Sequence, residues 1–206
     1  IPLKTVVEKL LSVIAGSPAT TRRRIARVLG AIGDVRALTR LSDMLSDPDE
    51  GVRLAAVAAL GAIGSQQASW ALARCVDDQS EKVRRRAVEV ISGMPDERSL
   101  PVLGKALADR SPDVRGAAAI GLGKVPGTEA VAHLLRGLAD GSEEVRQTVV
   151  DTVGAYRDVR TVEPLIGMPV TTVPMPGSEN TRWIGIRNGP PLCRGSTCSA
   201  RAKPAA

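Results

Sequence analysis

Aromatic residues are almost absent from this sequence of 206 residues, which contains no phenylalanine, one tyrosine and two tryptophans. Aromatic side chains dominate the hot spots of protein interfaces, so the chain offers few such anchors. The apolar residues are mostly alanine, valine, leucine and isoleucine. Small aliphatic side chains of this kind suit closely stacked helices.

Histidine occurs once, at His133. Catalysis by Ser-His-Asp or Cys-His groups would have to use this residue, yet no acidic residue follows it that could orient the ring. We therefore interpret His133 as an ordinary surface histidine and predict no catalytic residues.

Cysteine is also sparse, with only Cys75, Cys193 and Cys198. Three cysteines do not make a disulfide framework, and Cys193 and Cys198 lack the second pair of ligands that a zinc site needs. A reducing compartment is the default for such a chain, so we expect a cytoplasmic protein. No apolar run approaches the ~20 residues of a membrane-spanning helix, and no Walker-type phosphate loop occurs. The sequence predicts no metal, no cofactor and no membrane contact.

A repeat of 31 residues organises most of the chain, and its clearest copy spans 109–139. The most regular polar residues of the repeat are an aspartate and, six positions later, an arginine. In the four clearest copies these are Asp47 and Arg53, Asp78 and Arg84, Asp109 and Arg115, and Asp140 and Arg146. A fixed period in this range indicates a stack of similar supersecondary units.

Each repeat is expected to form two helices. In the copy at 109–139, Ser111 can cap the first helix, Pro112 suits its first turn, and Asp113 interacts favourably with the helix dipole. A buried stripe follows at helical spacing: Val114, Ala118 and Leu122. We expect Pro126 and Gly127 to end this helix and a second helix to follow. The period then predicts helix pairs at about 17–46, 48–77, 79–108, 110–139 and 141–167.

The repeated aspartates and arginines have two possible roles. One is a row of arginines that binds a ligand. The other is a structural ladder, in which each aspartate accepts backbone N–H groups of its turn and each arginine reaches the neighbouring repeat. We favour the ladder, because a residue needed in every repeat is more simply explained by the stacking.

Glycines recur at the end of the first helix, as in the pairs Gly61 and Gly64, and Gly121 and Gly123. Their register with the repeat predicts that they permit close helix packing rather than phosphate binding.

The repeat unit reads D-x-(S/D)-x-x-V-R-x-x-A-x-x-A-L-G-x-(I/V)-G. This unit resembles the HEAT repeat, in the short form named for phycobilisome lyases, and the resemblance covers about 17–166. It implies an all-α solenoid, a right-handed superhelix of about five helix pairs, in which the helix carrying Val-Arg lines the concave side. It also implies a non-catalytic scaffold whose partner is another protein. The single histidine excludes the HEAT-like deoxyhypusine hydroxylases, which need several His-Glu pairs.

Two alternatives remain open at this stage. One is an accessory subunit of a bilin lyase or a related enzyme, as the name of the repeat suggests. The other is a HEAT-like nucleic-acid-binding protein, which would want a continuous basic groove with aromatic residues.

The outward positions of the first helices form the candidate binding face. They lie two, three and six residues after the valine of the motif, or after Thr21 in the first copy. These positions hold Arg23, Arg24, Arg27, Leu54, Ala55, Ala58, Arg85, Arg86, Glu89, Gly116, Ala117, Ile120, Gln147, Thr148 and Asp151. The face is basic in two repeats, small and apolar in two, and acidic in the last. Mixed character of this kind favours a protein partner and makes nucleic acid unlikely as a ligand. A simple solvated surface would also account for the arginine clusters.

The chain divides into three parts by pattern. Residues 1–16 are expected to form the second helix of a truncated preceding repeat, and 17–166 the repeat array. Residues 167–206 show no helical period and read as an irregular or disordered tail. Five basic residues and one acidic residue lie from 167 onward, so the tail carries +4 of the net charge of +6.

The tail also has a second interpretation, as the product of a frameshift. Codons for 171–177, read from their third base, permit Asp-Asp-x-Pro-Asp-Ala-Arg, the opening of another repeat. The arginine would then lie two periods after Arg115. Sequencing the coding DNA across 160–206 distinguishes the two, because a real tail requires an intact reading frame there.

Overall fold

The computed structural model describes residues 3–94 and 99–155, which form α-helices joined by short loops and 3₁₀ turns. The α-helices are α1 (Leu3–Val13), α2 (Ala19–Ile32), α3 (Leu38–Asp43), α4 (Glu50–Ile63), α5 (Gln66–Leu72), α6 (Glu81–Ser92), α7 (Leu100–Ala106), α8 (Pro112–Leu122), α9 (Thr128–Gly137) and α10 (Glu143–Ala155). No strand occurs among these residues. The all-α architecture predicted from the period is therefore confirmed.

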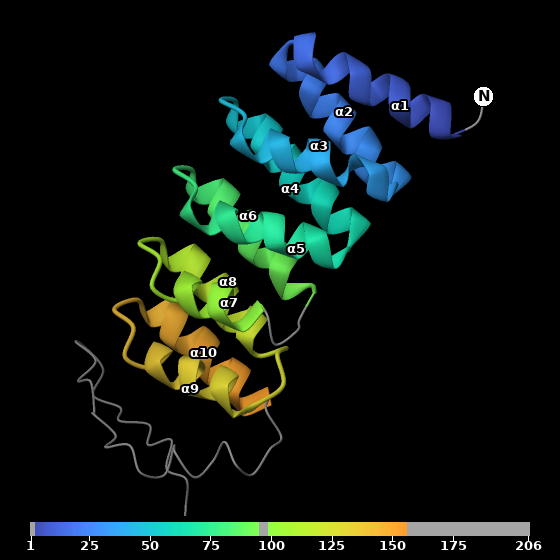
Figure 1. Cartoon of the computed structure of the whole chain (residues 1–206). Helices are drawn as coiled ribbons and strands as arrows, with labels where there is room; N and C mark the ends of the chain where they lie inside the picture. The colour runs from blue at the N-terminus through green and yellow to red at the C-terminus, as the bar shows by residue number, and fades with distance from the viewer. Residues whose placement is uncertain (1–2, 95–98, 156–206) are drawn as a thin grey trace, which may run out of the picture. The chain divides into compact units, whose positions relative to one another are not determined.

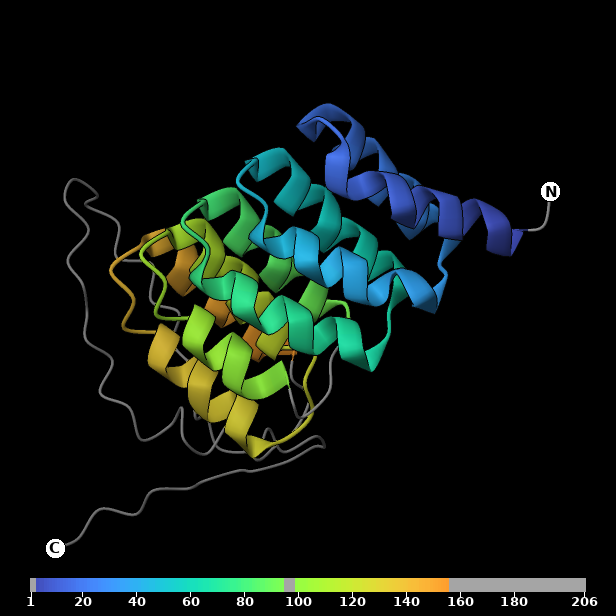
Figure 2. The same cartoon turned by 45° about the horizontal axis from the view of Figure 1, so that its top comes forward.

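The helices stack in two rows (Figures 1 and 2). We call α2, α4, α6, α8 and α10 the first helices, and α1, α3, α5, α7 and α9 the second helices. Each first helix packs against the next one along the chain. This is the arrangement of an α-solenoid, in which a repeat contacts mainly its neighbours. The predicted second helix after α10, and the tail from 167 onward, lie outside the described residues.

The core lies between the two rows and is made of aliphatic side chains in register with the period. The motif valines are buried completely or almost so, and so are the leucines and the isoleucine near the ends of the first helices. These residues are Val52, Val83, Val114, Val145, Leu29, Leu60, Ile91 and Leu122. The predicted stripe of Val114, Ala118 and Leu122 is fully buried.

The ends of the helices differ in part from expectation. Gly33 and Gly64 end α2 and α4 in the left-handed region, with φ of 72° and 65°, where glycine meets no steric penalty. The prediction that Pro126 and Gly127 end the first helix of their repeat is wrong, because α8 already ends at Leu122. Gly127, with φ of 120°, instead occupies the N-cap position of α9.

Ser111 also departs from its predicted role. It occupies the N-cap position of α8, but its side chain accepts no capping hydrogen bond. The hydroxyl instead donates to Glu81 Oε1 of the preceding repeat at 2.9 Å, and the Ser111 N–H donates to Asp109 Oδ1 at 2.8 Å. The residue links repeats rather than capping its own helix.

Glycines set how closely successive first helices approach. A β-carbon at Gly30 would lie 2.7 Å from Ala59 Cα, and one at Gly61 would lie 2.6 Å from Val90 Cγ1. Gly123 approaches Thr152 in the same way. At these crossings the glycine is on the earlier helix and the larger residue is on the later one.

The crossing between α6 and α8 has the opposite arrangement. Position 92, in register with Gly61 and Gly123, is a buried serine, and its counterpart on α8 is Gly121. A β-carbon at Gly121 would collide with Ser92 Oγ and would lie 3.0 Å from Leu103 Cδ2. Each crossing between α2 and α10 thus carries one glycine, on one side or the other.

This complementarity predicts an effect of exchanging the two residues. Gly121→Ala should cost about 1–3 kcal/mol of the free energy of unfolding, because a core this tight cannot accept another methyl group. Adding Ser92→Gly should recover most of that loss, since the pair then resembles Gly61 and Val90. Urea denaturation of both single variants and the double variant measures the coupling. Gly116→Ala, where nothing lies within 4 Å of the added methyl group, is the control and should not destabilise. Equal stability of the Gly121→Ala and double variants would contradict the interpretation.

Candidate functional site

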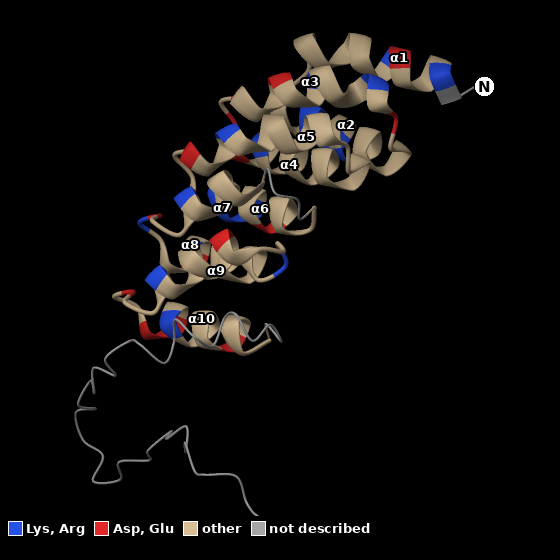
Figure 3. Cartoon of the chain, turned by 60° about the horizontal axis from the view of Figure 1, so that its bottom comes forward, with Lys and Arg blue, Asp and Glu red and all other residues tan. Residues whose placement is uncertain are grey.

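Arginines and aspartates join each repeat to the next at the loops before the first helices. Arg84 Nε and Nη2 donate to the Asp109 carboxylate at 2.8 and 3.0 Å, and Arg84 Nη1 donates to the Asp78 carbonyl at 2.9 Å. The same bidentate pairing joins Arg22 to Asp47, Arg53 to Asp78, and Arg115 to Asp140. We call this series the Arg–Asp ladder. Figure 3 shows acidic and basic segments together along the loop edge of the stack.

The carboxylates of the ladder also organise their own loops. Each accepts a backbone N–H from two residues further on, at 2.8–2.9 Å, from Asp49, Ser80, Ser111 and Ser142. Arg146 Nη1 donates to the Asp140 carbonyl at 2.7 Å. The ladder arginines are therefore engaged in stacking, which leaves them poorly placed to bind a ligand.

The ion pairs of the ladder are largely shielded from solvent. The side chains of Arg84 and Asp109 are only 4% and 8% exposed. Hydrogen bonds from Arg22 and Arg115 lower the pKa of Asp47 and Asp140 respectively, against the opposing effect of burial.

The outward positions of the first helices form one face, which we call the first-helix face. Seven of the eleven charged, polar or larger apolar residues predicted there are exposed: Arg24, Arg27, Arg85, Arg86, Ile120, Gln147 and Asp151; Thr148 is half-buried. Arg23, Leu54 and Glu89 are half-buried. Ala55 was expected to point outward but is only 6% exposed.

Ion pairs neutralise the middle of this face. Arg85 binds Glu89 at 2.9 Å and Asp113 on α8 at 3.2 Å, and Arg86 binds Glu89 at 3.1 Å. Toward α2, Arg23 binds Asp49 at 3.1 Å. The arginines of α6 therefore do not form the uncompensated basic stripe that nucleic acid favours.

Arg23 extends across the first turn of α4, where Gly51 leaves room for its guanidinium. A β-carbon at Gly51 would lie 2.5 Å from that group. Within the described part of the chain, the buried Nε of Arg23 has no hydrogen-bond partner. The basic side of the face thus retains a donor that its own helices do not satisfy.

A shallow hollow of about 490 Å³ lies on the same face, across α6, α8 and α10. Gly116, Ala117 and Ile120 line its floor, and Arg85, Glu89 and Glu144 are among the charged residues around it. Gly116 is in register with Leu54 of α4 and Arg85 of α6, so the lining of the hollow has no side chain at that position. Ile120 is 50% exposed there, which is unusual for an isoleucine in a core-forming repeat.

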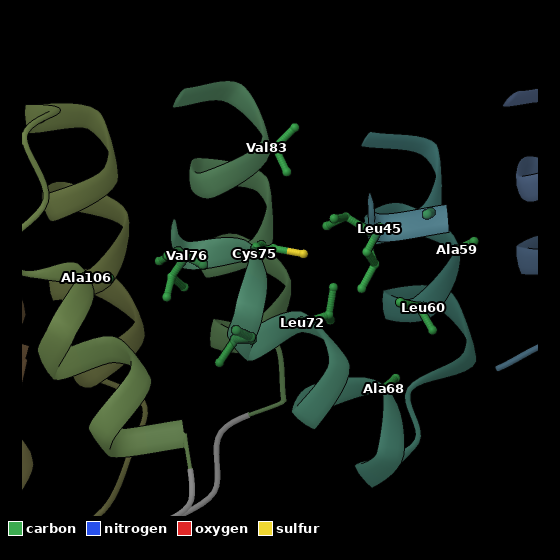
Figure 4. Packing of buried hydrophobic residues seen from close by; sticks show 14 of the residues in the cluster. Leu45, Ala59, Leu60, Ala68, Leu72, Cys75, Val76, Val83 and Ala106 are labelled. Atoms are coloured by element: carbon green, nitrogen blue, oxygen red, sulfur yellow. The ribbon is translucent and has the colours of Figure 1, made fainter. Parts of the chain in front are cut away.

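Candidate reactive residues offer little chemistry. The ring of His133 lies against Gly104 of α7, so this residue is partly buried rather than simply on the surface as expected. Cys75 is buried among Leu45, Leu72 and Val83 (Figure 4), and burial raises the pKa of its thiol to about 11. A thiol in that state is a packing residue at neutral pH. Across 3–94 and 99–155, no three His, Cys, Asp or Glu residues are placed to hold a metal ion.

Trp70 was not singled out by the sequence reasoning. It is 67% exposed on α5, in the row of second helices. Its register with Thr39, Pro101 and Ala132 places it at an outward position, so the period contained the signal for its exposure.

Comparison with known families matches the model described as HEAT repeats, over residues 7–92, 69–154 and 100–171. The chain belongs to the HEAT-repeat family. Among curated protein sequences, no match was found.

Solved structures share the fold of this HEAT-repeat chain. The complex of CpcE and CpcF of phycocyanin lyase from Nostoc sp. PCC7120 has a TM-score of 0.57 and 22% identity, covering 72% of this chain and 98% of that one. A designed armadillo repeat protein in complex with the peptide (KR)4 has a TM-score of 0.56 and 22% identity, covering 78% and 86%. The S. pombe condensin Cnd3-Cnd2 subcomplex has a TM-score of 0.63 and 21% identity, covering 78% of this chain and 23% of that one. At these identities the likeness shows the fold alone. No helix in the described ranges has the length and apolar character needed to cross a membrane.

Breaking one pair of the ladder should be costly. Arg84→Met leaves the Asp109 carboxylate buried without its cation, and we expect a loss of about 3–5 kcal/mol in the free energy of unfolding. The control is Arg40→Met, because Arg40 pairs with Asp43 at 3.6 Å with both side chains well exposed. That change should cost less than about 1 kcal/mol. Urea denaturation measures both, and similar losses would show that the ladder does not hold the stack.

The ladder also predicts an acid limit to stability. Because the pKa values of Asp47 and Asp140 are lowered in the folded chain, the ladder stabilises it fully above the unfolded-state pKa of about 3.9. That contribution is lost as the pH falls through the lower, folded pKa. The urea concentration at the midpoint of unfolding should therefore decrease once the pH falls below about 4. In an Arg115→Met, Asp140→Asn variant, the urea midpoint should decrease less steeply as the pH falls. The same dependence on pH as in the unmodified chain would contradict the assignment of the acid sensitivity to the ladder.

Proposed function

We propose that this HEAT-repeat protein is a non-catalytic scaffold or adaptor that binds another protein along its first-helix face. The hollow over Gly116 and Ile120 carries the proposal, because it offers an exposed apolar floor within a ring of charged residues. A partner side chain can be buried there while polar contacts form around it, as in the core and rim of a protein interface.

The stacking machinery supports a binding role for this face rather than a structural one. The Arg–Asp ladder lies in the first turns of the first helices and in the loops before them, and the glycine crossings lie between the helices. Outward residues such as Arg24, Arg27 and Ile120 contribute to neither. The requirements of binding a ligand can therefore determine which residues occupy these positions.

An accessory subunit of a bilin lyase or related enzyme is a second candidate. It is favoured by the similarity to the complex of CpcE and CpcF of phycocyanin lyase. In that case the protein partner would be an enzyme subunit or its substrate protein, and the same face would serve. Nucleic-acid binding is the weaker alternative, because ion pairs offset the arginines in the middle of the face.

Filling the hollow tests the proposal. Gly116→Leu places there the side chain that α4 carries at Leu54, so the fold should accept it while the apolar floor is covered. We expect binding of the partner to weaken by about tenfold or more, because its anchoring side chain loses its site. Immobilised protein is used to capture ligands, which are identified by mass spectrometry and then titrated as purified proteins.

Gly116→Ala is the matched control. Its methyl group meets nothing within 4 Å, and it should raise helix stability by up to about 1 kcal/mol without closing the hollow. Proteins held by the unmodified chain and by Gly116→Ala, but not by Gly116→Leu, are the expected partners. Capture that is the same with all three would contradict binding through this face.

A further inference from the structure

The ion pairs of the first-helix face are concentrated between its two ends. They join Arg23 to Asp49, Lys82 to Glu50, Arg85 to Glu89 and Asp113, and Arg86 to Glu89. Each of these charges has an opposite charge within 4 Å, which leaves little field for a ligand. Few charges in the middle of the face are therefore unpaired among the described residues, and Lys124, which lines the hollow, is one of them.

The two ends of the face keep their charge. Arg24 and Arg27 are exposed on α2, and Glu144 and Asp151 are exposed on α10. Within the chain that the structure describes, no ion pair involves any of these four residues. The face thus has a basic end with two exposed charges and an acidic end on α10, where Glu143 is exposed as well.

The separation of the two ends follows from helix packing. Four successive crossings lie between α2 and α10, and packed helices are about 8–10 Å apart, so the path along the face from one end to the other is about 32–40 Å long. The hollow over Gly116 and Ile120 lies between them, nearer the acidic end. A ligand that complements the face must place acidic residues opposite its basic end and basic residues opposite its acidic end.

We propose that the partner of this face is a protein segment with an acidic cluster and a basic cluster separated by about 32–40 Å. The acidic cluster lies over Arg24 and Arg27, and the basic cluster lies over Glu144 and Asp151. Apolar side chains between the clusters lie over the hollow. The inference rests on the proposed function and names the chemistry of its partner.

Other occupants fit less well. A uniformly basic segment or a nucleic acid would be repelled at one end of the face. A second copy in antiparallel orientation would bring basic ends to acidic ends, with the ion-paired α6 surfaces opposite each other. In that orientation the hollow of each copy would lie opposite α4 of the other, because the hollow lies nearer the acidic end, so the two apolar floors would not cover each other.

Peptides with a rigid spacer test the distance between the ends. Each peptide carries a fluorescein label. The long peptide joins a run of four glutamates to a run of four lysines through twelve prolines, a polyproline spacer that spans about 37 Å at about 3.1 Å per residue. The short peptide joins the same two charged runs directly, so that its eight residues span at most about 29 Å. The acidic half and the basic half of the long peptide each keep the twelve prolines and one charged run. Binding of all four is measured by fluorescence anisotropy at low salt.

We expect the long peptide to bind at least about tenfold more tightly than each of the other three peptides, because only the long peptide engages both ends of the face at once. Equal binding of the long and short peptides would overturn the proposal. So would binding of the long peptide no tighter than that of one of its halves.

Charge reversal tests the two ends directly. Arg24→Glu with Arg27→Glu, and separately Glu144→Lys with Asp151→Lys, should each weaken binding of the long peptide by about tenfold or more. The fourfold variant exchanges the ends and should bind the peptide again, in the opposite direction. Arg74→Glu with Arg136→Glu is the control for the arginine pair, because it makes the same change in net charge among the second helices. Failure of the fourfold variant to regain binding would overturn the proposal.

Sedimentation equilibrium identifies a second copy as the occupant. One outcome is a dimer of the unmodified chain that is lost in each of the two charge-reversed double variants and forms again when these two variants are mixed. That result would replace the proposed protein segment with a second copy of this chain as the partner. The Gly116→Leu capture experiment separates this inference from the proposed function. If capture depends on the hollow while the peptides show no dependence on spacer, only the charge pattern of the partner is wrong.

Discussion

Each junction between neighbouring repeats contains an arginine that hydrogen-bonds both to the loop of its own repeat and to the carboxylate of the next. In the junction built by Arg84, the carboxylate of Asp109 and the carbonyl of Asp78 together satisfy the guanidinium. Buried charges are tolerated only when their hydrogen bonds are complete. This requirement allows little variation in how one repeat is placed on another, so the stacking depends on it.

The separation of tasks within a repeat follows from this arrangement. Loops hold the ladder, inward positions build the aliphatic core, and glycines control the approach of the first helices. Nothing in this scheme constrains the outward positions of the first helices. Residues there can change from Arg27 through Ile120 to Asp151 without disturbing the stack, which is how one scaffold accommodates many ligands.

The period made the fold predictable, because the valines, leucines, aspartates and arginines repeat in register. It also identified the positions that form the first-helix face. It did not reveal that an arginine pairs with the aspartate 25 residues later, since that depends on how repeats stack. Ser111 illustrates the same limit, because the local pattern predicts a helix cap, whereas the side chain donates a hydrogen bond to Glu81 in another repeat. The hollow at Gly116 was equally hidden, because it arises from what three helices leave unfilled rather than from any one residue.

The glycine crossings also limit how such a chain can grow. Removing the repeat that carries α6 would bring Gly61 opposite Gly121 and leave a void between the joined helices. Duplicating that repeat would instead set Ser92 against Val90, where no space exists for both side chains. Although the repeats look alike in sequence, they are not interchangeable modules, and an insertion or deletion of a whole repeat would need compensating changes at the new junction. The packing contacts between neighbouring repeats are thus specific to the order in which the repeats occur.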